Sequence, residues 1–599
     1  MSGITIKPWP KLIRLRQELR DGSLSMEEFA ANLYDVVART GQRPLYEDPA
    51  RFFSLTYATP ALRDIAAAVA ERLRGKSAKG IRQLEMTYGG GKTHTMVTLT
   101  HLVRDPAALP PLPAVQEFES SMGGKAPRAR VAAVCFDKID AELGCPAIAP
   151  DGSQRSLFQP WSIIAWQLAG PDGLRMMRGD GEDAERDTPP SDLVLEKLLN
   201  VPAQEGLGVL LLMDEVMMWV ADRAKHPVTG DHFFTQFENF LQSLTQAVAR
   251  VPTCALLVSL LASDPKKDDT RGRELLGRMS AILKRTEDEQ FLPVGRDDVA
   301  EVLRRRLLDP ETVKDKEAFR PNVVAAVKAL VSLDPDFAKT PAQRAEKERA
   351  FLEAFPFDPA LMDVFYSKWT SGLPLFQRTR GVLRTFAVAL KEAEAWDTAP
   401  VAGASVLLPP PGQGALGIAL RDLAGVARTS QTEGEAQAWT SILEKELSFA
   451  RDSQATLGGL AYRELESAVV ATFLHSQPPG KRATLAELKA MVGAGKPDAI
   501  TLGKALAEWA EKSWYLDEED LASGAVKPDG SKELPRTWRM GDQPNLKTDA
   551  RRRQAIACVR CGGRGAAAGT GEERREAEGG AGAGCQGPHA AGRPRRRGG

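Results

Sequence analysis

A glycine-rich run near residue 90 ends in side chains that can bind phosphate and metal: Gly89, Gly90, Gly91, Lys92, Thr93 and His94. Glycines let the backbone curl so that successive N–H groups face an anion, and a helix starting there adds its positive end. The lysine can then reach the β- and γ-phosphates while the threonine hydroxyl binds Mg²⁺. The run predicts a nucleotide-phosphate loop, although Met86 replaces the first glycine of the Walker A pattern. An ordinary glycine turn beside a lysine is the alternative.

Two adjacent carboxylates follow an apolar run further along the chain. Val209–Met213 is continuously apolar and is followed by Asp214 and Glu215. At the tip of a buried strand, Asp214 can hold Mg²⁺ and Glu215 can polarise an attacking water. A helix N-cap followed by a first-turn acid is the plainer alternative. Paired with the glycine loop, the two acids favour a site for ATP and Mg²⁺.

Further polar residues are candidates for assisting hydrolysis. Ser263, or less favourably Ser259, stands at the end of another apolar run and could hydrogen-bond the γ-phosphate or the water; either serine could equally cap a turn. Arg285 is the candidate for an arginine presented to the γ-phosphate of a neighbouring subunit, with Arg278 as its competitor. Solvated helix charges are the alternative for both.

These residues require elements that bring them together. Continuous apolar runs of strand length are typical of strands buried on both faces of a parallel sheet. The predicted strands are 81–86, 131–136, 209–213, 254–261 and 290–294. Helical patterns alternate with them, so we predict an α/β fold of the P-loop NTPase class with a parallel sheet. Aromatic residues at Tyr46, Phe52 and Phe53 either close over an adenine ring or cap the domain.

The rest of the chain is predicted to be mainly helical, with a lid and a C-terminal winged-helix-like domain whose wing is the extended stretch 536–540. A proline-rich stretch at 407–414 is typical of a linker. The predicted domains are 1–80 (N-terminal helical segment), 81–296 (P-loop ATPase core), 297–400 (helical lid), 401–461 (linker and helix), 462–546 (winged-helix-like) and 547–599 (disordered tail).

Composition limits the classes of partner. Lys+Arg and Asp+Glu are both 79, so any DNA contact would have to be local. The start lacks the apolar run of a signal peptide, and no apolar run is long enough to span a membrane. Six cysteines in 599 residues indicate no disulfide framework. We therefore expect a cytoplasmic protein without membrane contact.

The tail differs from the chain before it. After Arg551 the sequence is almost entirely Gly, Ala, Arg and Glu without an apolar period, which predicts disorder. Cysteines at Cys558, Cys561 and Cys585, with His589, lack the compact spacing of zinc modules, so no metal site is expected there. The composition would also suit an out-of-frame read-through of GC-rich DNA.

Several motifs carry a family resemblance. They are Gly-Gly-Gly-Lys-Thr-His-Thr, Met-Asp-Glu, the Arg-Arg-Arg-Leu-Leu at 304–308 and, most particularly, the Phe-Gln-Arg-Thr-Arg-Gly at 376–381. Together they resemble AAA+-type predicted ATPases, long catalogued as a domain of unknown function, over roughly residues 30–546. The resemblance implies an AAA+-like fold in which Arg380 reaches the γ-phosphate from the lid, with Arg378 and Arg384 as alternatives. A helix start with surface ion pairs is the plainer interpretation.

The resemblance also implies a setting. Family members are typically encoded beside DNA methyltransferase and helicase genes in prokaryotic anti-phage defence or restriction-modification islands, so those proteins are the implied partners. A homo-oligomer and direct DNA contact stay open. Family members usually continue beyond the point where this chain becomes low-complexity, which a truncated or frame-shifted gene would explain.

Three functions follow from these observations. The first is a Mg²⁺-dependent ATP hydrolase that acts as a motor or switch in a DNA-associated defence system. The second is a nucleotide-dependent DNA-binding regulator or loader, in which Lys481, Arg482 and Lys504 meet phosphates. The third is a scaffold that binds ATP without turnover, against which Glu215 beside Asp214 argues.

Overall fold

The computed structural model of the chain describes residues 6–22, 31–84, 91–224, 230–260, 270–284, 295, 298–370, 373, 376, 378–427, 438–517 and 533–545. All of them belong to one unit, Met1–Asn545. The predicted fifth strand at 290–294 and the tail at 547–599, with its cysteines, lie outside the described residues.

A four-stranded parallel sheet positions the predicted site. The strands among the described residues are β1 (Ile81–Gln83), β2 (Ala129–Cys135), β3 (Cys145–Ile148), β4 (Gln154–Leu157), β5 (Gly208–Asp214), β6 (Cys254–Val258), β7 (Ala483–Thr484) and β8 (Thr537–Trp538). Within the sheet the order is β1-β6-β5-β2, and every neighbouring pair is parallel. The predicted α/β class and parallel sheet are therefore confirmed.

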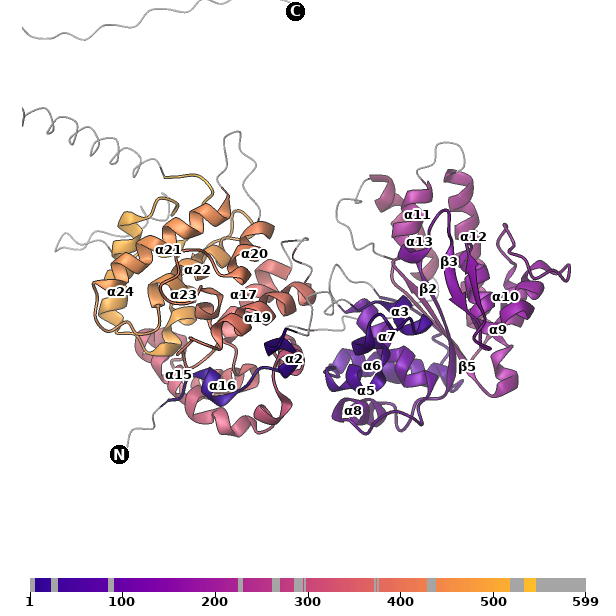
Figure 1. The fold of residues 1–599 in the computed structure, drawn as a ribbon, viewed down its shortest axis with the longest axis horizontal. Helices are drawn as coiled ribbons and strands as arrows, with labels where there is room; N and C mark the ends of the chain where they lie inside the picture. The colour runs from indigo at the N-terminus through magenta and orange to yellow at the C-terminus, as the bar shows by residue number, and fades with distance from the viewer. Residues whose placement is uncertain are drawn as a thin grey trace, which may run out of the picture. The chain divides into compact units, whose positions relative to one another are not determined.

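Helices cover both faces of the sheet (Figure 1). In the first half of the chain the helices are α3 (Leu33–Ala38), α4 (Pro44–Glu47), α5 (Pro49–Ser54), α6 (Pro60–Leu73), α7 (Lys92–Arg104), α8 (Pro113–Ser121), α9 (Pro160–Arg178), α10 (Asp192–Leu199), α11 (Val216–Ala224), α12 (Gly230–Arg250) and α13 (Thr270–Lys284). Helices α3 and α5–α8 pack on one face, and α9–α13 pack on the other. The site residues at the strand tips are therefore enclosed by two cores.

The alternating direction of the side chains along each strand explains why there are two cores. In β5, Leu210 and Leu212 join the core with α6 and α7, whereas Val209, Leu211 and Met213 join the core with α9 and α12. Successive strand residues point to opposite faces, so a strand covered on both faces must be apolar throughout. All seven residues of β5 are buried.

A third core gathers the remaining helices and the start of the chain. These helices are α1 (Trp9–Leu12), α2 (Gln17–Arg20), α14 (Val299–Leu307), α15 (Arg320–Leu333), α16 (Pro341–Ala354), α17 (Pro359–Val364), α19 (Arg378–Ala393), α20 (Ile418–Val426), α21 (Trp439–Ala455), α22 (Glu464–His475), α23 (Leu485–Val492) and α24 (Ala499–Lys512). Trp9 donates from its indole Nε1 to Asp397 at 2.8 Å, which anchors the N-terminal residues there. The predicted segment 1–80 therefore contributes to two different cores.

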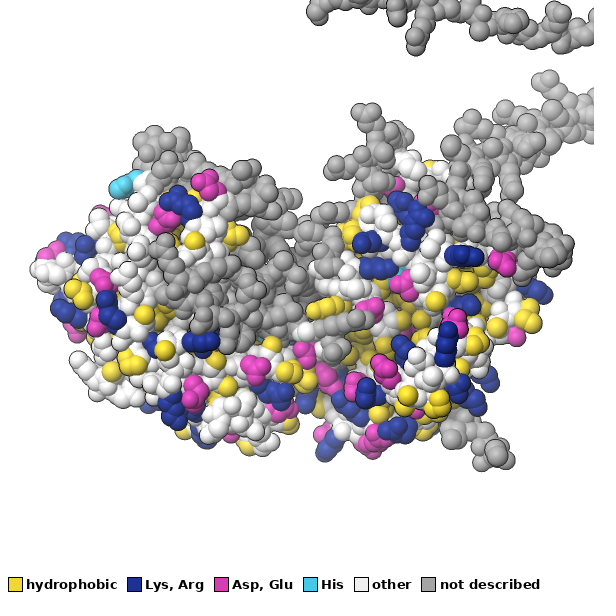
Figure 2. Space-filling view, turned by 180° about the vertical axis from the view of Figure 1, so that it is seen from behind, with side chains coloured by type: hydrophobic (Ala, Val, Ile, Leu, Met, Phe, Trp, Pro, Cys, Tyr) yellow, Lys and Arg dark blue, Asp and Glu magenta, His cyan; other side chains and the backbone are white. Residues whose placement is uncertain are grey.

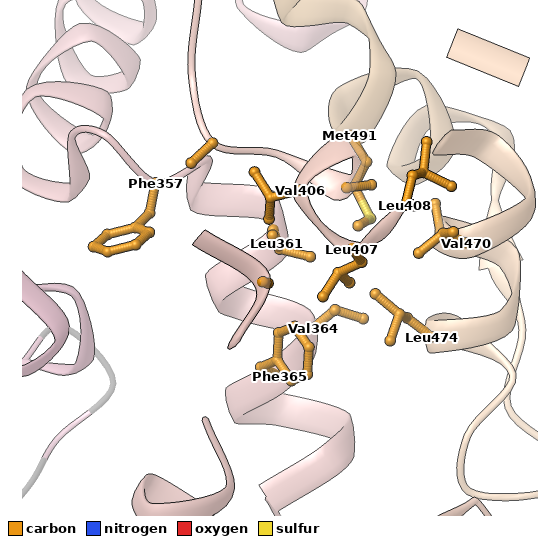
Figure 3. Packing of buried hydrophobic residues seen from close by; sticks show 14 of the residues in the cluster. Phe357, Leu361, Val364, Phe365, Val406, Leu407, Leu408, Val470, Leu474 and Met491 are labelled. Carbon is orange, nitrogen blue, oxygen red and sulfur yellow. The ribbon is translucent and has the colours of Figure 1, made fainter. Parts of the chain in front are cut away.

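The predicted linker differs from what the structure shows. Val406, Leu407 and Leu408 are at most 1% exposed, whereas a linker would leave them in water. In the view of Figure 3, Leu407 lies between Leu361 of α17 and Leu474 of α22, and all three belong to the same hydrophobic core. The predicted lid and C-terminal domain therefore share one hydrophobic core, because burying these apolar side chains is more favourable than exposing them.

The C-terminal residues form helices with a small sheet. Strands β7 and β8 pair antiparallel, and an isolated antiparallel bridge joins Leu516 to Met540.

Within the described part of the chain, no helix is long and apolar enough to cross a membrane. Basic and acidic side chains are interspersed on the face that Figure 2 shows.

Candidate functional site

Helix α7 begins directly after a glycine in a left-handed conformation. Gly91 has φ of 90°, which a residue with a Cβ adopts only at a cost. Its carbonyl accepts from the N–H of Thr95 at 2.8 Å and so closes the first turn of the helix. The first N–H groups of a helix have no partner within it and point toward any bound anion. Gly89 and Gly90 lie outside the described residues.

The predicted metal-binding pair is in direct contact. Thr93 Oγ1 donates a hydrogen bond to Asp214 Oδ2 at 2.9 Å. Strand β6 lies between β1 and β5 in the sheet, so the chain entering α7 and the tip of β5 are separated by two strand spacings, about 9.5 Å. The start of α7 closes this separation, because it places Thr93 over the strand tips.

Asp214 is buried and has an unused oxygen. The residue is 4% exposed, and its Oδ1 has no hydrogen-bond partner among the described residues. Burial raises the pKa of the Asp214 carboxyl, and Lys92 and the hydroxyls of Thr93 and Ser259 oppose this effect. A buried carboxylate oxygen without a partner is costly unless a ligand satisfies it. The donor set, one carboxylate and one hydroxyl, suits the oxygen ligands that Mg²⁺ prefers.

Lys92 is held beside the two acids. Its side chain belongs to the first turn of α7 and the residue is 7% exposed. Burial lowers the pKa of the Lys92 ammonium, and the negative charges of Asp214 and Glu215 oppose that shift. The three predicted residues therefore interact electrostatically, as a phosphate-binding lysine and its metal-binding acids would.

Glu215 occupies a strained backbone position. Its φ is 58°, in the left-handed region that non-glycine residues rarely adopt. The chain turns there from β5 into α11, and the N–H of Met218 donates to the Glu215 carbonyl at 3.0 Å. Backbone strain of this kind is often found at functional sites.

The tip of β6 contributes a serine between the two loops. Ser259 is fully buried, and its Oγ makes no hydrogen bond of acceptable geometry to any described residue. Its N–H donates to the carbonyl of Met213, the residue before Asp214, at 2.8 Å, which places Ser259 next to the tip of β5. Ser263, which the sequence favoured, lies outside the described residues. Which of the two serines stands at the tip of β6 depends only on where the strand ends. Strand β6 ends at Val258, so Ser259 is the serine at its tip.

Sequence reasoning missed one acid near the site. Asp137 follows β2 in a short 3₁₀ turn and raises the Asp214 pKa through its negative charge. It pairs with Lys138 at 2.9 Å. No local pattern predicted this, although an acid just beyond a strand adjacent to β5 was the available signal.

Those predicted arginines whose side chains the structure describes do not join the site. Arg285 lies outside the described residues. Arg278 pairs with Glu238 and lies over the Phe234 ring at 4.6 Å. Arg380 is exposed on α19, and within the described part of the chain no hydrogen bond or ion pair joins it to Lys92, Thr93 or Asp214. Arg384 pairs with Asp422 at 3.0 Å on the surface.

His94 faces away from the strand tips. Its ring packs against Phe52 with centroids 4.8 Å apart, and Nε2 lies 3.4 Å from Thr56 Oγ1. Burial, with the nearby charge of Arg306, holds the pKa of His94 well below its usual value.

Tyr46, Phe52 and Phe53 are each at most 2% exposed and belong to the core beside α7, so they fit a cap better than an adenine clamp.

Comparison with known proteins identifies one similarity. Residues 6–288, just under half of the chain, match the family described as DUF499 N-terminal domain. No curated protein and no solved structure matches the chain. No group of three or more His, Cys, Asp or Glu side chains suited to hold a metal occurs among the described residues. The segment similar to DUF499 contains the four described strands of the parallel sheet, together with Lys92, Thr93 and Asp214.

Proposed function

We propose that the chain is a Mg²⁺-dependent ATP hydrolase of the AAA+ type, acting as a motor or switch in a DNA-associated defence or restriction-modification system. The observation that carries the proposal is the Thr93–Asp214 hydrogen bond beside a buried Asp214 oxygen that has no hydrogen-bond partner among the described residues. An ordinary glycine turn would not require a lysine, a hydroxyl and a carboxylate to converge at the strand tips.

Each residue has a role that its position supports. The first turn of α7 and Lys92 bind the phosphates, and Thr93 and Asp214 hold the metal ion. Bound Mg²⁺ would supply positive charge to the phosphates during transfer. Glu215, next to Asp214, orients and deprotonates the attacking water, while Ser259 donates from the tip of β6.

The remaining features of the proposal rest on the family resemblance. We include in it a helical lid that responds to the nucleotide, self-association in which Arg285 acts in trans, and work alongside a DNA methyltransferase and a helicase. No nuclease or methyltransferase motif accompanies the site, so the expected output is mechanical or regulatory.

Phosphate release and ATP binding by the full chain test the proposal. We expect Lys92→Ala to abolish ATP binding and Glu215→Gln to bind ATP without turnover. Asp214→Asn keeps an acceptor for Thr93 but loses charge, so Mg²⁺ should no longer tighten ATP binding. An unchanged protein that neither binds nor hydrolyses ATP would overturn the proposal.

A second candidate is nucleotide-dependent DNA binding, which the order of the C-terminal elements favours. Helices α22, α23 and α24 with the antiparallel β7–β8 pair follow the order of a winged-helix domain. Lys481 and Lys504 are exposed, but Arg482 lies 3.9 Å from Asp517.

Fluorescence anisotropy with duplex DNA at two salt concentrations tests this second candidate. We expect Lys504→Ala to weaken binding and reduce its salt dependence, while Lys339→Ala, at an exposed residue just before α16, leaves both unchanged. The absence of salt-sensitive binding in the presence of ATP would exclude it.

A further inference from the structure

Arg306 on α14 is a buried cation whose described partners are neutral. The residue is 8% exposed, and its guanidinium lies over the Tyr46 ring at 5.5 Å. Its Nη1 lies 3.4 Å from the Tyr46 hydroxyl and its Nη2 lies 3.3 Å from His94 Nδ1. Within the described residues, no carboxylate forms an ion pair with Arg306, so its positive charge is buried without a counter-charge.

The donor and the acceptor of the hydrogen bond between Arg306 and His94 can be assigned. A guanidinium only donates hydrogen bonds, so Nδ1 of His94 must accept from Arg306. Thr56 Oγ1 donates to the Phe52 carbonyl at 2.8 Å, and it is therefore free to accept from Nε2 of His94. The imidazole is thus neutral with its proton on Nε2, and both ring nitrogens are oriented by fixed partners.

A second cation joins the same helix to the same region. Arg16 Nε donates to the Arg305 carbonyl at 3.1 Å, and its Nη2 donates to the Ser54 carbonyl at 3.2 Å. Burial lowers the pKa of Arg16, and the like charge of Arg306 adds to that shift. Arg16 and Arg306 therefore join helix α14 to the segment before α6, and both arginines donate their hydrogen bonds to uncharged acceptors.

A nearby anion would stabilise this arrangement by balancing the charge of Arg306. Burying a cation against neutral acceptors recovers only part of its lost hydration. His94 is the third residue of α7, so it belongs to the helical turn whose N–H groups would bind phosphate. An anion at that turn would lie close to Arg306 and would offset its buried charge.

We propose that Arg306 is a positioning residue that docks α14 onto the first turn of α7 through His94, and that nucleotide phosphates bound at this turn strengthen the docking. This inference rests on the proposed nucleotide site. By linkage, a docked α14 must raise nucleotide affinity by the same factor as the nucleotide strengthens docking. The effect should increase with the number of phosphates, because each adds negative charge.

Calorimetric titration of the full chain with ATP, ADP and AMP in Mg²⁺ buffer tests the inference. We expect Arg306→Met to weaken ATP binding at least tenfold, ADP binding less, and AMP binding less than twofold. Arg306→Lys keeps the charge and should restore part of the ATP affinity. Arg305→Met removes the same charge from the neighbouring residue and should leave the affinity within twofold.

Amide hydrogen exchange of α14 supplies a readout independent of turnover. ATP should slow exchange in Val299–Leu307 in the unchanged protein and in Arg305→Met, but not in Arg306→Met. A double substitution with His94→Gln should weaken binding by less than the product of the two single effects, because both remove the same contact.

The outcomes separate this inference from the proposed function. If Lys92→Ala abolishes ATP binding while Arg306→Met binds ATP normally, the nucleotide site stands and the docking role is overturned. Equal weakening of ATP and AMP by Arg306→Met would also overturn it, because that pattern indicates a purely structural role. An unchanged protein that binds no ATP would overturn both.

Discussion

The carbonyl of Ser259 accepts a hydrogen bond from the N–H of Val216 at 3.2 Å. The N–H of Ser259 in turn donates to the Met213 carbonyl at 2.8 Å. The tip of β6 is therefore tied to the chain on both sides of Asp214 and Glu215. This pairing holds the Ser259 hydroxyl beside the buried carboxylate without satisfying it.

Replacing Ser259 should affect turnover rather than stability. Ser259→Ala removes a buried hydroxyl that makes no hydrogen bond of good geometry to any described residue, so the free energy of unfolding should stay within about 1 kcal/mol or rise. Phosphate release should fall roughly tenfold if the hydroxyl assists hydrolysis. Ser162→Ala is the matched control, because the Ser162 hydroxyl in α9 is also buried and also makes no hydrogen bond to a described residue. Equal turnover in both variants would contradict the role of Ser259.

The strained position of Glu215 predicts a trade between stability and activity. Glu215→Gly relieves a φ of 58°, so the midpoint of urea unfolding should not fall and stability should rise by up to about 1 kcal/mol. Turnover should be lost, because the carboxylate is removed. Arg39→Gly relieves a φ of 50° on the surface and should stabilise the chain with turnover intact. Loss of stability in Glu215→Gly alone would show that the side chain has a structural role.

His101 should make the folded chain sensitive to acid. Its Nε2 lies 2.7 Å from the Tyr46 carbonyl, and burial lowers the pKa of the imidazole to about 4. The unfolded chain, with a pKa near the usual 6.5, binds more protons between these values, so the folded chain loses stability as pH falls from about 6.5 to 4. The contribution is about 3 kcal/mol.

Urea unfolding at pH 7 and pH 5 measures this effect. A glutamine can donate to the same carbonyl without titrating, so His101→Gln should show a smaller loss of unfolding free energy between the two pH values. Identical losses in His101→Gln and the unchanged protein would exclude a buried neutral histidine at this position.

The shared core of the helical elements is also testable. Leu407 is 1% exposed between α17 and α22, so Leu407→Ala should cost about 2–5 kcal/mol of unfolding free energy. Leu143→Ala, at a residue that is 75% exposed, should change stability by less than about 0.5 kcal/mol. A cost near zero for Leu407→Ala would restore the linker interpretation.

Much of the sheet and its site could be predicted because the signals are local. The apolar runs at 131–136 and 209–213 correspond to β2 and β5 within two residues at each end. Lys92, Thr93 and Asp214 were recognisable because the phosphate-binding and metal-binding chemistry needs those residue types beside a strand tip. Ser259 was ranked below Ser263, because strand ends depend on pairing with neighbours that a single sequence does not specify.

The sequence alone determined the fold class and the central residues of the candidate site, since strand periodicity and loop chemistry depend on neighbours within a few residues. Tertiary structure decided which distant residues meet. The burial of Leu407, the docking of Trp9 near Asp397 and the contact between Arg306 and His94 all join residues far apart in the chain. Such contacts depend on how whole elements pack against one another, and no local pattern encodes that packing.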